Sequence, residues 1–215
     1  YDEYEFSVET SLSTIEHMTY EEALEYGFVI DEVSGGYSVS EWEKDEKVLI
    51  IPKTIDNIDV VEIGSYESFS NKEKLEKVII LADVRTFGYY CFKNCKNLKE
   101  VTMSTNHGDL DSSFHNCPCI SKVESGVTYV KINNNPYYLA SKVDENDTSI
   151  FFNMNTKAFG GPLFFQNKKV KDVYLPDISR IDSRFFYQAT ALRGITIPDT
   201  VEEIGEEAFK ECSSL

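Results

Sequence analysis

A repeat of about 22 residues constrains this chain more than any other feature of its sequence. Six times, a phenylalanine is followed six positions later by an aliphatic residue, and successive phenylalanines lie 23, 22, 50, 22 and 23 residues apart. The pairs are Phe69/Leu75, Phe92/Leu98, Phe114/Ile120, Phe164/Val170, Phe186/Leu192 and Phe209/Leu215. A unit this short cannot bury its apolar stripe alone, so the copies are expected to stack, phenylalanine on phenylalanine.

Each unit also contains a short strand pattern. Apolar residues stand three and five positions after the aliphatic residue, and this alternation predicts a strand with one buried face. The pairs are Leu49/Ile51, Val78/Ile80, Val101/Met103, Val173/Leu175 and Ile195/Ile197. Three of these strands are followed by Pro52, Pro176 and Pro198, and proline cannot donate the hydrogen bond that would continue a ladder.

An apolar residue followed by glycine precedes most of the phenylalanines by five or six positions. The dipeptides are Ile63-Gly64, Phe87-Gly88, Phe159-Gly160 and Ile204-Gly205. Glycine lets the chain change direction sharply without a clash from Cβ, so each dipeptide predicts a tight turn.

The combined consensus is apolar-x-apolar-Pro followed by Ile-Gly-x-x-x-Phe-x-x-Cys-x-x-Leu, and it is most complete in residues 192–215. Over roughly residues 48–215 the chain resembles the BspA-like leucine-rich-repeat family of bacterial surface proteins. The resemblance implies an α/β leucine-rich-repeat solenoid of short parallel strands joined by short helical or irregular turns. It also implies a secreted or surface-attached protein, located outside the cell or on its surface.

Residues 1–47 lack the repeat and are expected to form an N-terminal cap on the solenoid of residues 48–215. Thr19 and Glu22 fit a capping box that opens a short helix. Apolar segments on both sides of residues 34–36 predict a hairpin.

The long interval between repeats predicts an inserted long repeat at about residues 121–158. Alternating segments flank the turn-rich residues 133–136, which indicates a hairpin, and the family resemblance implies one at this place as well. At the other end, Leu215 begins a further repeat, so the array is expected to continue beyond the chain end.

The formal net charge of −16 repels phosphate backbones and anionic lipid headgroups, which argues against nucleic acid as a partner. No stretch approaches the ~20 consecutive apolar residues that span a bilayer, so no membrane insertion is expected in this segment. The cysteine count of five is odd and rules out complete pairing within the chain.

Three cysteines, Cys95, Cys117 and Cys212, occupy the third position after a repeat phenylalanine. Other copies have Lys72, Asn167 or Ala189 there, so a small side chain in a buried slot explains these cysteines without any chemistry. A Cys95–Cys117 disulfide stays conceivable, because adjacent copies lie about 5 Å apart.

One compact group of potential metal ligands lies in the third repeat. His107, Asp109, Asp111 and His115 alternate in a way that could hold a divalent cation, although solvated turn residues explain the spacing equally well. We expect no cofactor. The sequence contains no nucleophile elbow, phosphate-binding glycine loop or zinc-protease motif, so it does not predict an enzyme.

The pattern therefore predicts a non-enzymatic module that binds an extracellular or host protein, as an adhesin would. Exposed aromatic side chains are the natural anchors of such a surface. The candidate ligand-binding residues are Tyr89, Tyr90, Tyr137, Tyr138 and Tyr187. The alternative is a structural spacer or self-associating stalk that carries another domain. A glycan hydrolase is disfavoured because nothing places two carboxylates across a cleft.

Overall fold

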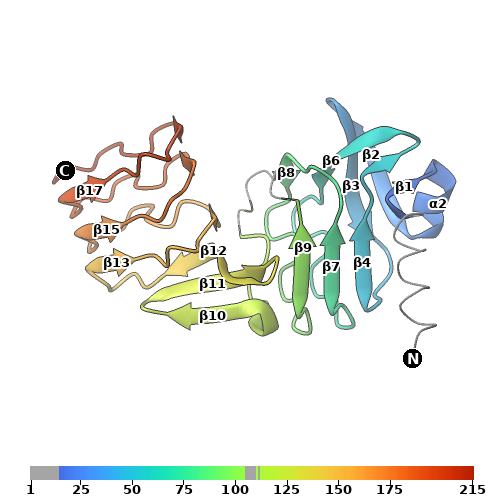
Figure 1. The fold of residues 1–215 in the computed structure, drawn as a ribbon, viewed down its shortest axis with the longest axis horizontal. Helices are drawn as coiled ribbons and strands as arrows, with labels where there is room; N and C mark the ends of the chain where they lie inside the picture. The colour runs from blue at the N-terminus through green and yellow to red at the C-terminus, as the bar shows by residue number, and fades with distance from the viewer. Residues whose placement is uncertain (1–14, 105–109, 111) are drawn as a thin grey trace. The chain divides into compact units, whose positions relative to one another are not determined.

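The computed structural model describes residues 15–104, 110 and 112–215 (Figure 1). The chain divides into two compact units, which are described separately. Unit 1 comprises residues 1–108 and 113–119, and unit 2 comprises residues 109–112 and 120–215.

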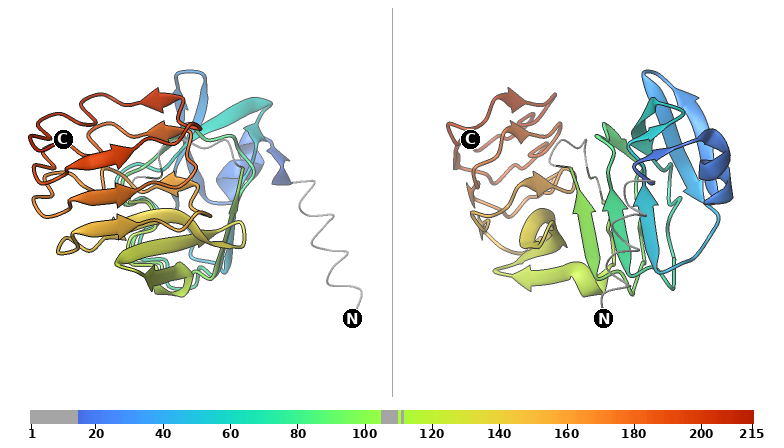
Figure 2. Two further views of the ribbon diagram at one scale, coloured as in Figure 1. Left: turned by 60° about the vertical axis from the view of Figure 1, so that its left-hand side comes forward. Right: turned by 45° about the vertical axis from the view of Figure 1, so that its right-hand side comes forward.

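In unit 1 the repeat strands form a parallel sheet in the order β4-β7-β9. The strands are β4 (Val48–Ile51), β7 (Lys77–Ile80) and β9 (Glu100–Met103). Leu49, Val78 and Val101 occupy the same register position, and each is at most 1% exposed. These are the strands and buried faces that the alternating pattern predicts, and Figures 1 and 2 show them side by side.

A second sheet of unit 1 has the order β1-β5-β6-β3-β2, with β8 paired to β6. Its strands are β1 (His17–Met18), β2 (Phe28–Val33), β3 (Gly36–Trp42), β5 (Thr54–Ile55), β6 (Ile58–Ile63) and β8 (Thr86–Phe87). Helix α2 (Tyr20–Glu25) begins with the capping box, because Thr19 Oγ1 accepts from the Glu22 N–H and Glu22 Oε2 accepts from the Thr19 N–H. Strands β2 and β3 form an antiparallel hairpin.

Unit 2 begins with an antiparallel meander of β10 (Ser121–Glu124), β11 (Val127–Ile132) and β12 (Asn135–Val143), preceded by the 3-10 turn η1 (Pro118–Ile120). The parallel repeat strands follow, in the order β13-β15-β17. They are β13 (Ser149–Phe151), β15 (Asp172–Tyr174) and β17 (Gly194–Thr196). The repeat register therefore resumes at Ile150, which pairs with Val173, before residue 158 is reached.

The phenylalanines stack as the spacing predicts. In unit 1, ring centroids of Phe69 and Phe92 lie 5.2 Å apart and those of Phe92 and Phe114 lie 5.3 Å apart. In unit 2 the Phe164–Phe186 and Phe186–Phe209 distances are 5.0 and 5.1 Å. The aliphatic partners Leu75, Leu98, Ile120, Val170 and Leu192 are buried, whereas Leu215 is 54% exposed.

The turns that carry the phenylalanines are irregular and not helical. Their backbones bond directly to each other: the Phe69 N–H donates to the Cys91 carbonyl at 2.9 Å, and the Phe186 N–H donates to the Ala208 carbonyl at 2.8 Å. The residues two positions before and two positions after a phenylalanine adopt left-handed backbone conformations. They are Glu67/Asn71, Tyr90/Asn94, Ser112/Asn116, Arg184/Gln188 and Glu207/Glu211, together with Gln166.

Amide side chains at the second of these positions bond from turn to turn. Asn94 donates to Asn71 at 3.0 Å, and Asn116 donates to Asn94 at 2.6 Å. Asparagine also tolerates the left-handed conformation better than most residues. The same side chain thus fits the turn and joins it to its neighbour.

The apolar-glycine dipeptides stand at the ends of short strands, and Gly64 has a left-handed backbone conformation with φ of 70°. Their apolar residues lie in a second set of short parallel strands, which includes β14 (Ala158–Phe159) and β18 (Glu203–Ile204), and β18 pairs with the equivalent strand β16 (Arg180–Ile181), where Asp182 replaces the glycine. A Cβ on Gly88 would lie 2.0 Å from the Ser65 carbonyl oxygen, and one on Gly205 would lie 2.4 Å from the Ser183 nitrogen. At these two positions glycine is required because the neighbouring turn is too close for a side chain.

Helices are scarce among the described residues. Over the ranges that are described, none of them has the length and apolar character needed to cross a bilayer.

Candidate functional site

Three tyrosines gather on the turns of two adjacent repeats in unit 1. The rings of Tyr66 and Tyr89 stack with centroids 6.2 Å apart, and Tyr90 meets the Tyr89 ring edge-on at 4.2 Å. Tyr66 is 67% exposed and Tyr89 is 43% exposed. We call Tyr66, Tyr89 and Tyr90 the tyrosine cluster. Tyr90 is half-buried, so Tyr66 and Tyr89 form the exposed part of the cluster.

An ion pair borders the cluster. The Lys93 ammonium lies 2.7 Å from Glu67 Oε1 and 4.8 Å from the centre of the Tyr90 ring. The hydrogen bond from Lys93 lowers the pKa of Glu67, and the same bond raises the pKa of Lys93. The His115 ring also contacts Tyr90 in a T-shaped arrangement, with ring centroids 5.2 Å apart. Cationic and anionic groups therefore flank one aromatic patch.

The repeat architecture fixes these rings in place. Tyr66 and Tyr89 both stand three positions before a stacked phenylalanine, so their rings are separated by one repeat interval. The Glu67 N–H donates to the Tyr89 carbonyl at 3.0 Å, and Tyr90 holds a left-handed backbone conformation with φ of 58°. A partner would meet a surface that is already ordered, which lowers the entropic cost of binding.

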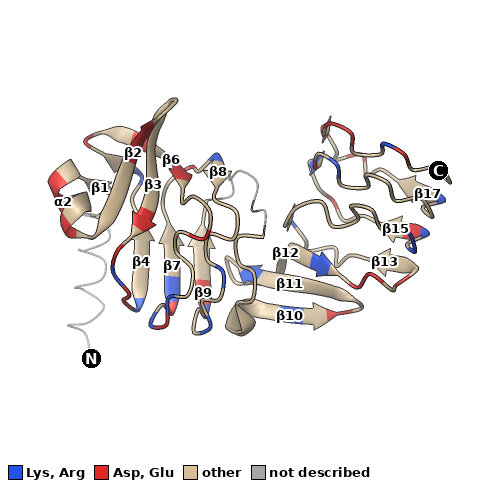
Figure 3. Cartoon of the chain, turned by 180° about the vertical axis from the view of Figure 1, so that it is seen from behind, with Lys and Arg blue, Asp and Glu red and all other residues tan. Residues whose placement is uncertain are grey.

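The unit that carries the cluster is acidic. Unit 1 contains 22 of the 37 acidic residues and 10 of the 21 basic residues, a formal net charge of −12. Figure 3 shows acidic positions on α2, β2, β3 and β6. This charge favours partners with basic surfaces.

The other candidate tyrosines belong to unit 2 and do not form one patch. Tyr138 is only 5% exposed, so its ring packs inside and is not presented at the surface. Tyr137 is half-buried, and its hydroxyl donates to Glu124 Oε2 at 3.1 Å and accepts from Lys122 at 2.5 Å. Tyr187 stacks on Phe165, with ring centroids 5.2 Å apart.

Sequence reasoning missed two of the exposed aromatic residues at these places, Tyr66 and Phe165. Tyr66 could have been found, because it precedes Phe69 by the same three positions by which Tyr89 precedes Phe92. Phe165 and Tyr187 likewise both follow a stacked phenylalanine by one position. Comparing equivalent positions between repeats is the signal that identifies such pairs.

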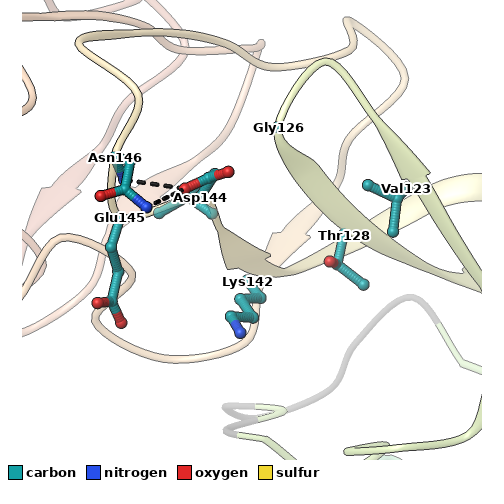
Figure 4. A pocket seen from close by; sticks show the side chains of 8 residues that line it. Val123, Gly126, Thr128, Lys142, Asp144, Glu145 and Asn146 are labelled. Carbon is teal, nitrogen blue, oxygen red and sulfur yellow. Dashed lines mark hydrogen bonds between the residues drawn. The ribbon is translucent and has the colours of Figure 1, made fainter.

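A shallow open pocket of about 370 Å3 lies in unit 2 between the β10–β11 hairpin and the turn after β12 (Figure 4). Its lining includes Lys142, Asp144, Glu145 and Asn146. The Asn146 backbone N–H and side-chain amide both donate to Asp144 Oδ1, at 2.9 and 3.2 Å. These groups shape their own turn and do not converge on a common point.

Only one of the four candidate metal ligands is among the described residues. His107, Asp109 and Asp111 lie outside the described residues, and His115 is exposed beside Tyr90. Among residues 15–104, 110 and 112–215, no three His, Cys, Asp or Glu side chains come together as a metal site would require.

All five cysteines are described, and none of them forms a disulfide, so the conceivable Cys95–Cys117 bridge is absent from the structure. Cys95 and Cys117 are buried, and each donates a hydrogen bond to the phenylalanine carbonyl of the preceding repeat: Phe69 at 3.3 Å and Phe92 at 3.1 Å. Contact with the Cys95 thiol and burial raise the pKa of Cys117, so this thiol stays protonated and keeps its role as a donor. The third position after the phenylalanine is thus occupied by a small residue whose thiol also donates a hydrogen bond to a backbone carbonyl of the neighbouring repeat.

Comparison with known proteins agrees with this architecture. A family model described as "BspA type Leucine rich repeat region (6 copies)" matches residues 49–144 and 112–215. Among solved structures, a leucine-rich-repeat protein of T. pallidum is 17% identical, with 88% of each chain covered and a TM-score of 0.45. None of the curated proteins compared with the sequence matches it.

Two further bacterial structures are similar over part of their length. A leucine-rich-repeat protein from Bacteroides ovatus is 22% identical, with 88% of this chain and 50% of that chain covered and a TM-score of 0.44. A leucine-rich cell surface protein from Faecalibacterium prausnitzii is 26% identical, with 88% and 52% covered and a TM-score of 0.39. This chain spans about half the length of these two. Since the family model accounts for nearly every residue after position 48, the chain belongs to the BspA-type leucine-rich-repeat family.

Proposed function

We propose that this chain is a non-catalytic binding module of a bacterial surface protein, and that it attaches to an extracellular or host protein through the tyrosine cluster. The family is one of bacterial surface proteins, and its repeats generally serve protein interaction. The observation that carries the proposal is the pair of stacked, largely exposed rings of Tyr66 and Tyr89 on adjacent turns.

Tyrosine suits this role for physical reasons. Its ring buries a large area at little conformational cost, and its hydroxyl forms a hydrogen bond once water has been excluded. Neighbouring Glu67 and Lys93 supply charges that would orient the partner.

The test is a binding assay against a panel of purified extracellular-matrix and cell-surface proteins. We expect at least one panel protein to bind, and the double variant Tyr66→Ala/Tyr89→Ala to weaken that binding about tenfold or more. Met154→Ala is the control, because Met154 is a 61% exposed apolar residue of unit 2 outside the cluster. If the double variant binds the partner as tightly as the wild type, the tyrosine cluster is not the binding surface. If the chain self-associates as its concentration rises and binds no panel protein, the result favours the alternative function of a self-associating stalk.

The proposed location is testable separately. Brief protease treatment of intact cells that carry the native protein should remove this segment while cytoplasmic markers stay intact. Protection of the segment until the cells are broken would contradict a surface location.

A further inference from the structure

Two aromatic side chains stand exposed on the outer face of the repeat sheet in unit 2. Phe151 of β13 and Tyr174 of β15 are 56% and 54% exposed, and their rings are nearly parallel, with centroids 4.3 Å apart. They occupy the same register position on neighbouring strands. The residues that precede them, Ile150 and Val173, point inward and are at most 3% exposed. The pair is therefore held by the sheet and faces solvent.

The aromatic stack stops at the third strand. Because β15 lies between β13 and β17, Phe151 covers one face of the Tyr174 ring and the other face looks toward β17. There the register partner of Tyr174 is Thr196, and the partner of Asp172 is Gly194. A Cβ placed on Gly194 would meet no atom within 4 Å. Thr196 is exposed, and its side chain is too short to cover the Tyr174 ring as Phe151 does, so an open position remains over Gly194 beside that face of the ring.

We call this open position the sheet slot. It is bordered by Tyr174, Asp172, Gly194 and Thr196. Adjacent parallel strands are separated by about 4.8 Å. The Phe151–Tyr174 spacing of 4.3 Å shows that one strand interval accommodates a planar group against the Tyr174 ring.

The slot also has a charge. Asp172 stands on the same face of β15 as Tyr174, and one of its carboxylate oxygens accepts a hydrogen bond from the Ser149 hydroxyl at 3.3 Å. Its register partner Gly194 offers no side chain to cover it. A group that stacks on Tyr174 would therefore have the Asp172 carboxylate two residues away on the same face of β15, with one carboxylate oxygen already bonded to Ser149 of β13.

We propose that the sheet slot binds an arginine side chain of a partner protein, with the guanidinium plane stacked on Tyr174 and its N–H groups donating to Asp172. Guanidinium is planar, stacks on aromatic faces and pairs with carboxylates through parallel N–H bonds. Lysine has no plane to stack and fits the slot less well. Unit 2, which contains the slot, has 15 acidic and 11 basic residues, and its formal net charge of −4 favours a basic partner. This site is independent of the tyrosine cluster.

The test uses the intact 215-residue chain and a capped hexa-arginine peptide, with binding measured by calorimetry and the Tyr174 ring signals followed by NMR. Hexa-lysine is the matched probe of equal charge. Thr196→Tyr fills the slot with a third ring, and Gly194→Leu fills it from the open position. Asp172→Asn removes the carboxylate charge, and Asp199→Asn is a control at an exposed carboxylate of the same unit.

We expect hexa-arginine to shift the Tyr174 signals and to bind more tightly than hexa-lysine. Both filling variants should weaken hexa-arginine binding about tenfold, and Asp172→Asn should weaken it about threefold or more, while Asp199→Asn has little effect. Circular dichroism verifies that the filling variants remain folded. Equal affinities for the two peptides, equal affinities across all variants, or unmoved Tyr174 signals would each overturn the proposal. None of these results bears on binding through the tyrosine cluster, which the protein panel tests separately.

Discussion

Replacement of Phe92 by alanine tests the stacked core most directly. Phe92 is fully buried, and its ring lies between Phe69 at 5.2 Å and Phe114 at 5.3 Å. Truncation removes the ring from both contacts and leaves a cavity that the hydrogen-bonded turns on either side cannot close. Such substitutions cost about 3–5 kcal/mol, and we expect the free energy of unfolding to fall by this amount.

The structure supplies an internal comparison for this prediction. Phe209 has a single stacking contact, to Phe186 at 5.1 Å, and is only half-buried. Phe209→Ala should therefore cost about half as much, roughly 1.5–2.5 kcal/mol. Lys93→Ala, which removes a partly exposed and solvent-screened ion pair, should cost much less than either phenylalanine substitution. Urea denaturation followed by circular dichroism measures all three. Equal losses for Phe92→Ala and Phe209→Ala would refute the reasoning that stability depends on contacts to both neighbouring rings.

Three further predictions follow from other parts of the structure. Gly88→Ala should lower the free energy of unfolding by about 1–3 kcal/mol, because the added Cβ would lie 2.0 Å from the Ser65 carbonyl oxygen. Gly194 faces open space, so Gly194→Ala should change the free energy of unfolding by less than about 0.5 kcal/mol, and urea denaturation measures both variants. A thiol-alkylating reagent should label the exposed Cys119 quickly and the buried Cys91, Cys95 and Cys117 only on unfolding, and the masses of tryptic peptides show which thiols are labelled. Burial raises the pKa of Cys91, so rapid labelling of this thiol would contradict the described packing. The hydrogen bond from Lys93 lowers the pKa of Glu67 from its ordinary value of 4.5, so the stabilisation by this bond is present above pH 4.5 and is lost as the pH falls through the lower folded-state pKa. The denaturation midpoint of Glu67→Gln should therefore depend less on pH below 4.5 than that of the wild type. Glu73→Gln is the control, and parallel pH profiles of wild type and Glu67→Gln would argue against the bond.

The parts of the fold that every repeat shares could be predicted from the sequence. Six equivalent phenylalanines and five alternating pairs give each position several independent observations, so the stacked rings and parallel strands were identifiable without coordinates. The left-handed backbone conformation of the turn residues could not be predicted in this way. Their positions hold Glu, Tyr, Ser, Arg, Asn and Gln, and backbone sterics rather than a common side chain select the conformation.

The candidate sites were only partly predictable for a related reason. Tyr89 and Tyr90 stand out as an adjacent pair, but the cluster depends on Tyr66 in the preceding repeat, one stacking interval away. Phe151 was hidden because it follows the inserted long repeat, where the spacing that would align it with Tyr174 is interrupted. Tyr138 looks like its neighbour Tyr137 in the sequence, yet strand alternation turns the two side chains to opposite faces of β12, and only Tyr138 becomes buried.

Both proposed surfaces arise from the same property of the architecture. The buried phenylalanines and aliphatic residues set the distance between neighbouring copies, so an exposed residue at one position lies one interval from the equivalent residue of the next copy. Where two consecutive copies have aromatic residues at that position, as at Tyr66/Tyr89 and Phe151/Tyr174, a stacked platform forms without any change in the core. Where the third copy has a small residue, as at Gly194 and Thr196, the platform ends in an open position. Recognition can then differ between members of a repeat family through exposed residues alone, because none of these side chains contributes to the stack that holds the repeats together.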